Sequence, residues 1–268
     1  MNRLIIDKKG KIEIKNSQLI FNEYKYPLRQ IDFLILADDI EISTKTISKL
    51  TKENISILIY NKTFSFIHPQ NSKNADLKKA QYLSLNKRVD LAKHFISKKI
   101  TNNFLNIEFD IQKLNEAKSI DEIMGIEGSF AKKYFKEYFT LFPKHYTKGY
   151  RSKQPPEDIV NSMMSYLYTI VYYEITNRLL FFGFEPQIGY LHEPFRAHNA
   201  LSSDILEIFR SEIDKFVYKL FKNNLTKKDF TTNYRLRDEK RKELWTEIKT
   251  FLETLKIDKE ISYLRGLL

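Results

Sequence analysis

The hydrophobic periodicity of the chain changes near residue 70, and this change limits the folds that the sequence can adopt. Before this point, apolar residues occur in short segments with the alternation typical of β-strands, most clearly at residues 11–15. After it, they recur at the spacing of amphipathic helices. We therefore expect an α+β protein with a small N-terminal β-rich domain, residues 1–67, a polar linker, residues 68–76, and a larger all-helical C-terminal domain, residues 77–268.

Turn residues and helix-start signals predict individual elements within this division. Lys9 and Gly10 predict a turn between the first two strands. Ser43 is the expected N-cap of a helix at residues 44–53, because a serine side chain can accept a hydrogen bond from the first helical turn. The remaining elements expected from periodicity are strands at residues 3–7, 11–15, 18–21, 33–36, 55–60 and 64–67, and helices at residues 75–102, 107–114, 120–139, 156–182, 200–221 and 239–255.

The chain is basic, with 45 Lys+Arg against 34 Asp+Glu and a formal net charge of +11. This surplus favours a polyanionic partner such as nucleic acid, with an anionic membrane surface as the alternative. The N-terminal residues lack the apolar stretch of a signal peptide, and no uncharged apolar run reaches membrane-spanning length, so we expect a cytoplasmic protein outside the membrane. Because the chain has no cysteine, a bound metal ion must use oxygen and imidazole ligands, which favours Mg²⁺ or Mn²⁺.

Glu127 is expected on the apolar face of a helix, where helical spacing sets it beside Ile123 and Phe130. A carboxylate in such a place is normally paired, protonated or bound to a metal ion. The flanking residues Gly125 and Gly128 lower helix stability, which suggests that another group approaches the backbone there. That group could belong to a neighbouring helix, so a structural role for this segment stays open.

Three further residues offer ligand chemistry that agrees with Glu127. His192 contributes an imidazole, while Asp204 and Glu207, three positions apart, direct carboxylates to one side near the start of a helix. Each residue also has a simpler structural explanation. His192 could be an ordinary loop residue, and Asp204 and Glu207 could be exposed carboxylates that cap the helix. In a basic chain, their combination indicates a divalent-metal site that acts on phosphates.

A basic, aromatic-bearing loop at residues 146–156 precedes the expected helix at 156–182. Its residues Lys148, Arg151 and Lys153 could hold DNA backbone phosphates, which would give affinity without sequence preference. An ordinary solvated loop is the alternative. A second positive stretch, residues 227–242, could equally be a charged, exposed helix face.

Four motifs follow one another along the chain. They are residues 125–134 with Glu127, residues 151–161 with Pro155, Pro156, Asp158 and Asn161, residues 183–194 with His192, and residues 204–210 with Asp204 and Glu207. In this order, they resemble motifs of the CRISPR-associated integrase family Cas1, which inserts new spacers into CRISPR arrays. The likeness spans nearly the whole chain. It departs from the family pattern at residues 153–154, where the family often has consecutive arginines, and at residues 197–201, where the family often has Gly-Arg-x-Ser-Leu.

This resemblance implies that Glu127, His192 and Glu207 are metal ligands, with Asp204 as a supporting or alternative acidic ligand of the catalytic site. It also implies a Mg²⁺- or Mn²⁺-dependent DNA endonuclease and integrase that joins the 3′-hydroxyl ends of spacer DNA to the CRISPR repeat by transesterification. The implied partners are double-stranded DNA, a second copy of the chain bound through the N-terminal domain, and a Cas2 dimer. The alternatives are a metal-dependent DNA-repair nuclease that does not integrate, and a non-enzymatic DNA-binding protein.

Overall fold

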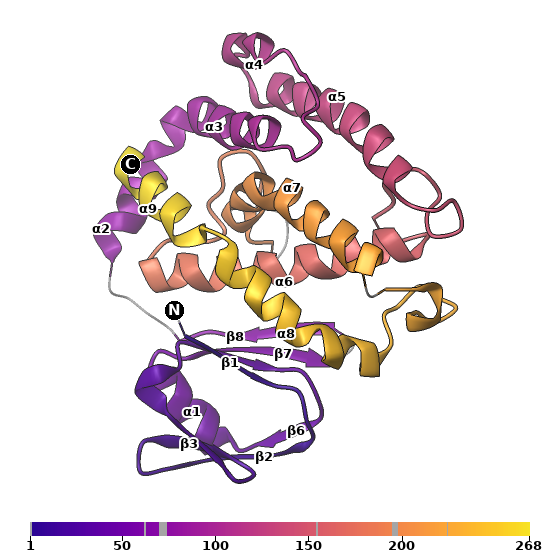
Figure 1. Cartoon of the computed structure of the whole chain (residues 1–268). Coiled ribbons are helices and arrows are strands. Elements are labelled where there is room, and N and C mark those ends of the chain that lie inside the picture. Colours follow the sequence, from indigo (N-terminus) through magenta and orange to yellow (C-terminus); the bar gives the residue numbers. More distant parts are fainter. Residues whose placement is uncertain (1, 62, 70–73, 154, 195–197, 224) are drawn as a thin grey trace. The chain divides into compact units, whose positions relative to one another are not determined.

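The computed structural model describes residues 2–61, 63–69, 74–153, 155–194, 198–223 and 225–268 (Figure 1). These residues form two compact units, Met1–Ala75 and Asp76–Leu268. The first is rich in strands and the second is helical, which confirms the expected fold class. Residues 70–73 of the expected linker lie outside the described residues. Within the described part of the chain, no helix has both the length and the apolar character needed to cross a membrane.

The N-terminal unit contains two four-stranded sheets among its described residues. The first sheet, in spatial order, is β1 (Arg3–Ile6), β5 (Phe33–Leu36), β7 (Ser56–Asn61) and β8 (Thr63–Ile67), and the second is β4 (Tyr24–Pro27), β3 (Gln18–Phe21), β2 (Gly10–Lys15) and β6 (Ile40–Ile42). In the first sheet, β1, β5 and β7 run parallel and β8 pairs antiparallel with β7. In the second, β3 lies antiparallel between β2 and β4, and β6 pairs parallel with β2.

Apolar side chains from both sheets and from α1 (Thr44–Lys52) form one core in this unit. Leu19 and Leu34 come from opposite sheets, Leu50 comes from the helix, and each is fully buried. The helix begins as predicted, because the Ser43 hydroxyl accepts a hydrogen bond from the Thr46 backbone N–H at 3.1 Å.

Two strands of the second sheet, β4 and β6, were not expected from the sequence. Both lie at the edges of the sheet and are only four and three residues long, so each offers too few residues for periodicity to identify it. Gly10, expected in a turn, is the first residue of β2. A Cβ atom at this position would lie 2.6 Å from the Phe21 ring, so close packing requires glycine.

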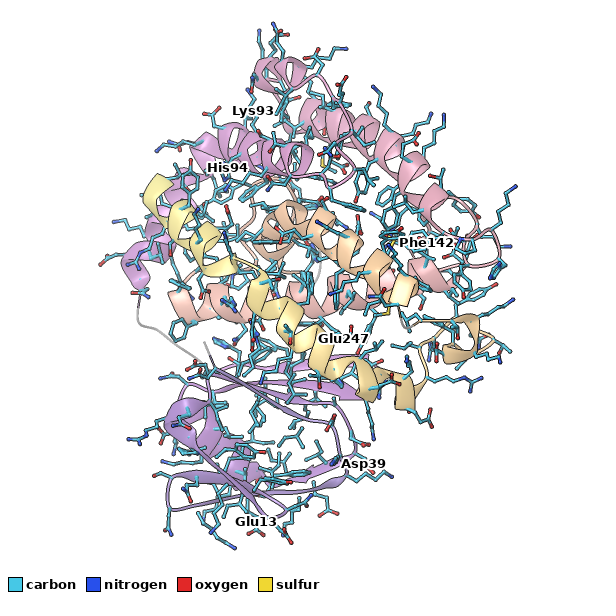
Figure 2. The ribbon with its side chains drawn as sticks, viewed as in Figure 1. Glu13, Asp39, Lys93, His94, Phe142 and Glu247 are labelled. Atoms are coloured by element: carbon cyan, nitrogen blue, oxygen red, sulfur yellow. The ribbon has the colours of Figure 1, made fainter. Side chains whose placement is uncertain are left out.

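The described helices of the C-terminal part are α2 (Ala75–Leu83), α3 (Arg88–Thr101), α4 (Gln112–Glu116), α5 (Ile120–Tyr138), α6 (Ile159–Phe182), α7 (Ala200–Asn223), α8 (Asp238–Thr254) and α9 (Ile257–Leu267). The unit is built around two long helices that pack along each other, α6 and α7 (Figure 1). α3 packs on α7 and on α5, and α9 packs on α6. Shortly after α5, the centre of the Phe142 ring, labelled in Figure 2, lies 5.1 Å from that of Tyr138 and 5.6 Å from that of Phe221 on α7.

The helical unit differs from expectation in four places. The helix expected at residues 75–102 is divided by a 3₁₀ turn, Ser84–Lys87, where the Ser84 hydroxyl bonds with the Gln81 carbonyl and the Tyr190 hydroxyl. The helix expected at residues 156–182 begins later because Asp158 is its N-cap. The short helix expected at residues 107–114 lies instead at Gln112–Glu116, and α9 was not expected at all.

Candidate functional site

A pocket of about 100 Å³ in the helical unit brings together side chains that are far apart in the sequence. Glu127, His192 and Glu207, the three metal ligands implied by the resemblance, all line it. Arg151 and Lys153, two of the proposed DNA contacts, line it as well. The other lining residues are Lys99, Met124, Phe135, Leu191 and Arg210.

Lys99, on α3, links the two glutamates of the pocket. Its ammonium group donates a hydrogen bond to Glu127 Oε1, on α5, and another to Glu207 Oε2, on α7, at 2.6 Å. The Lys99 side chain is only 9% exposed, so the three charged groups form a largely buried cluster. Lys99 was not among the site residues predicted from the sequence, although its spacing from Phe95 and Ile96 places it on the buried face of its helix.

Glu207 is held in its ionised form by two cations. Burial alone would raise its pKa, but the positive charges of Arg210 and Lys99 outweigh this effect and keep the pKa well below its usual range. Arg210 follows three positions later on the same helix, and its Nε lies 2.7 Å from Glu207 Oε2. Glu207 is therefore a buried, negatively charged oxygen donor that lines the pocket.

Asp204 lies behind His192 and fixes its position. The Asp204 Oδ1 atom accepts the His192 backbone N–H at 2.9 Å and lies 2.8 Å from the imidazole Nδ1. Its Oδ2 atom accepts the backbone N–H groups of Tyr190 and Leu191 at 2.6 and 3.1 Å. When Nδ1 donates its proton to Asp204, Nε2 carries the lone pair that can bind a ligand. Asp204 thus occupies a supporting position, and it does not line the pocket itself.

The donor set fits a hard divalent cation in its chemistry. Two carboxylates and one imidazole, without thiolates, suit Mg²⁺ or Mn²⁺. As they stand, no three histidine or acidic side chains among the described residues gather closely enough to hold such an ion. The Lys99 ammonium already lies between the two glutamates and bonds with both, so the space between these carboxylates suits a cation.

The basic loop before α6 is shaped by Asp158 and Asn161. Asp158 caps the helix through the Asn161 backbone N–H at 2.7 Å, and its second oxygen accepts the Lys148 backbone N–H at 2.9 Å. The Asn161 side-chain oxygen accepts the Ser152 backbone N–H at 3.0 Å and an Arg151 guanidinium N–H at 2.9 Å. These two residues of the Pro-Pro segment therefore position the loop and its cations.

Lys148 lines a separate pocket. That pocket is also lined by Lys144, Lys227 and Tyr234, so it joins the loop to the second basic stretch of the sequence. The two positive segments that the sequence analysis treated as independent are neighbours in the helical unit.

The two guanidinium groups that line the pocket with Glu127 and Glu207 face one aromatic ring. Arg151 and Arg210 lie 5.6 and 4.8 Å from the centre of the Tyr168 ring. The Tyr168 hydroxyl donates a hydrogen bond to Asp214 Oδ1 at 2.5 Å. Burial raises the pKa of Asp214 to about 6, although this hydrogen bond opposes the rise. Arg151 therefore packs on the Tyr168 ring inside the protein, a contact that the sequence did not indicate.

The possibility of a neighbouring helix packed against Gly125 and Gly128 is wrong for the described residues, while approach by a group from outside the chain stays a prediction. A Cβ atom at either position would meet no atom within 4 Å among the described residues. Met124, beside them, is 40% exposed. The helix is therefore open along the turns that flank Glu127.

The pocket of the helical unit combines carboxylates and an imidazole, which can hold a divalent cation, with side chains that attract phosphates. The chain belongs to the family "CRISPR associated protein Cas1", whose sequence model matches residues 2–250. It is 30% identical, over 264 residues, to the CRISPR-associated endonuclease Cas1 1 of Thermodesulfovibrio yellowstonii. That match covers 86% of this chain and 83% of the relative.

Solved structures share the fold. A Cas1 protein from Thermotoga maritima superimposes with a TM-score of 0.87 at 20% identity, covering 100% of this chain and 96% of that one. A casposase bound to its integration product superimposes with a TM-score of 0.77 at 26% identity, covering 94% and 82%.

Proposed function

We propose that this protein is a divalent-metal-dependent DNA endonuclease and integrase of CRISPR adaptation, which joins spacer 3′-hydroxyl ends to the CRISPR repeat by transesterification. The observation that carries this proposal is the meeting of Glu127, His192 and Glu207 in one pocket. These residues come from two helices and a loop, and family membership gives their convergence a functional meaning.

The charge of the pocket suits a phosphodiester substrate. Two glutamates, Glu127 and Glu207, are accompanied by four cationic side chains, those of Lys99, Arg151, Lys153 and Arg210. The pocket is therefore net positive even when both carboxylates are ionised, and it attracts a DNA backbone. The open turns of α5 beside Glu127 leave room for that backbone to approach.

Glu127, Glu207 and the His192 Nε2 atom would hold Mg²⁺ or Mn²⁺. Bound there, the ion would supply charge stabilisation at the scissile phosphate and at the leaving oxygen. Side chains of the protein would position the ligands and contact the substrate. Asp204 orients the imidazole, Arg210 keeps Glu207 ionised, and Lys153 at the rim can pair with a phosphate oxygen. In the exchange, the incoming 3′-oxygen forms a new phosphodiester bond as the old one breaks, so no external energy source is needed.

The proposed partners follow from family membership. Double-stranded DNA is supported by the casposase, which shares 26% identity and was solved bound to its integration product. A homodimer and a larger complex with a Cas2 dimer are proposed for the same reason. Catalysis is assigned to the helical unit, because every residue of the pocket lies there.

A strand-transfer assay tests the proposal. Duplex DNA with 3′-hydroxyl ends is incubated with a CRISPR-repeat target in Mg²⁺, in Mn²⁺ and in EDTA. We expect joined product only with the metal ion, and a loss of at least about a hundredfold in Glu127→Gln and Glu207→Gln. Glu122→Gln, an exposed change in the first turn of the same helix as Glu127, should retain activity.

Other outcomes would support the alternatives. Metal-dependent cleavage without joined product would identify a repair nuclease. DNA binding without metal-dependent chemistry would identify a non-enzymatic DNA-binding protein. In either case the integrase proposal is wrong.

A further inference from the structure

We infer that Lys99 competes with the divalent ion: its ammonium group lies between Glu127 and Glu207, bonds with both, and must leave when the ion binds. This inference rests on the metal site of the proposed function. It adds a step that the ligand set alone does not contain, namely the exchange of one cation for another.

The position of Lys99 is unusual for a lysine. It lies on the face of α3 that also carries Phe95, Ile96 and Ile100, each at most 4% exposed. Lysine is rarely buried to this degree, because removing an ammonium group from water is strongly unfavourable unless it is paired. Here Glu127 and Glu207 provide the pairing, from two other helices. The lysine therefore stabilises a carboxylate pair that would otherwise repel itself.

The same contacts oppose the metal ion. An ion bound by Glu127 and Glu207 must approach the oxygens that now accept hydrogen bonds from Lys99. A divalent ion and an ammonium group cannot share that space, because like charges a few ångströms apart in a poorly solvated pocket repel strongly. Arg210 does not replace the lysine, since it contacts Glu207 alone of the two glutamates. Metal binding is therefore weakened by the free energy of the Lys99 contacts.

The competing interaction also has a structural benefit. It holds α3, α5 and α7 together at the site before the ion arrives, so the glutamates are preorganised. The flexible lysine stem allows the ammonium group to swing away without movement of the helix. The protein thus keeps an assembled site at low metal concentration and binds the ion with a higher Kd than the same site would have without the lysine contacts.

Mn²⁺ binding to the full-length protein at one fixed pH tests the inference, with electron paramagnetic resonance to measure free ion. We expect Lys99→Met to lower the Mn²⁺ Kd by about ten- to hundredfold, the range given by the loss of charged hydrogen bonds. Lys98→Met is the matched control, since Lys98 is the preceding residue of the same helix and pairs with Glu260 at 2.5 Å, outside the pocket. Its Kd should equal that of the wild type.

Thermal unfolding provides a second readout without catalysis. In EDTA, Lys99→Met should melt at a lower temperature than the wild type, because its carboxylates are left facing each other. Saturating Mn²⁺ should raise its melting temperature more than that of the wild type. If the methionine variant does not fold, Lys99→Gln, which removes the charge but keeps a polar side chain, is measured by the same criteria.

The failures of the two proposals are distinguishable. An unchanged or higher Kd in the folded Lys99 variant, with normal binding by the wild type, would overturn the role of Lys99 and leave the metal site intact. Absence of Mn²⁺ binding by the wild type would contradict the proposed function itself.

Discussion

At the scale of single residues, Asp214 shows how the buried network around Tyr168 affects stability. Its pKa is raised to about 6 by burial, above its ordinary value of 3.8, so the folded state holds the proton more tightly than the unfolded chain does. Stability from this group is present at low pH and is lost as the pH rises from about 4 through 6. The charged or titratable groups around it are Tyr134 and Tyr138 on α5, Tyr168 on α6, Arg151 in the loop and Arg210 on α7.

Replacing Asp214 with asparagine should therefore change the pH dependence of stability. The raised pKa of Asp214 adds about 3 kcal/mol to the free energy of unfolding at low pH, and roughly 1 kcal/mol of this contribution is lost between pH 5 and 8. Measured by urea unfolding, the stability of Asp214→Asn relative to the wild type should therefore rise by that amount as the pH increases from 5 to 8. Tyr168→Phe is the control: it removes a hydrogen bond that lowers the Asp214 pKa, so it should keep or enlarge the pH dependence. Parallel pH curves for the wild type and Asp214→Asn would contradict this account.

At the scale of elements, local patterns predict much of the fold but little of the site's interior. Periodicity predicts α5, α7 and α8 to within two residues of their observed ends. It does not predict β4 and β6, whose existence depends on hydrogen bonds to a neighbouring strand. It also does not identify Lys99, because the partners that define its role are 28 and 108 positions away. Local spacing could have found Arg210, three positions after Glu207.

The loop before α6 gives a prediction at this scale. Asn161 is fully buried, and its amide donates to the Tyr150 carbonyl while its oxygen accepts from Ser152 and Arg151. Asn161→Ala should destabilise the protein by about 1–3 kcal/mol and loosen the loop, because the loop's backbone groups lose buried partners. DNA affinity should fall although no charge is removed.

Hydrogen exchange of residues 146–157 and a DNA titration, in parallel, measure the two effects of Asn161→Ala. Ser165→Ala is the matched control: among the described residues of the loop, its hydroxyl accepts a hydrogen bond from the second guanidinium nitrogen of Arg151 alone, at 3.1 Å. It should leave exchange in the rest of the loop nearly unchanged. Weaker DNA binding by Asn161→Ala with normal loop protection would mean that this asparagine acts on DNA by another route.

At the scale of the whole molecule, chemistry and assembly are assigned to different units. Every residue that lines the active pocket lies in Asp76–Leu268. The strand-rich unit offers sheet edges instead, at β1 and β8 in one sheet and at β4 and β6 in the other. Unpaired strand edges can join across a twofold axis, so this unit is suited to form a homodimer.

A chain that begins at Ala75 should therefore keep the active pocket but lose the dimer. Joining both ends of one DNA requires two active sites at a fixed spacing, so two-ended integration should be lost while Mn²⁺ binding and helical circular dichroism persist. Sedimentation of the full chain and the truncated chain over a range of concentrations measures the assembly, and the strand-transfer assay measures the products. A monomeric full-length protein would contradict the homodimer itself. A truncated chain that still dimerises and joins both ends would show that assembly depends on the helical unit instead.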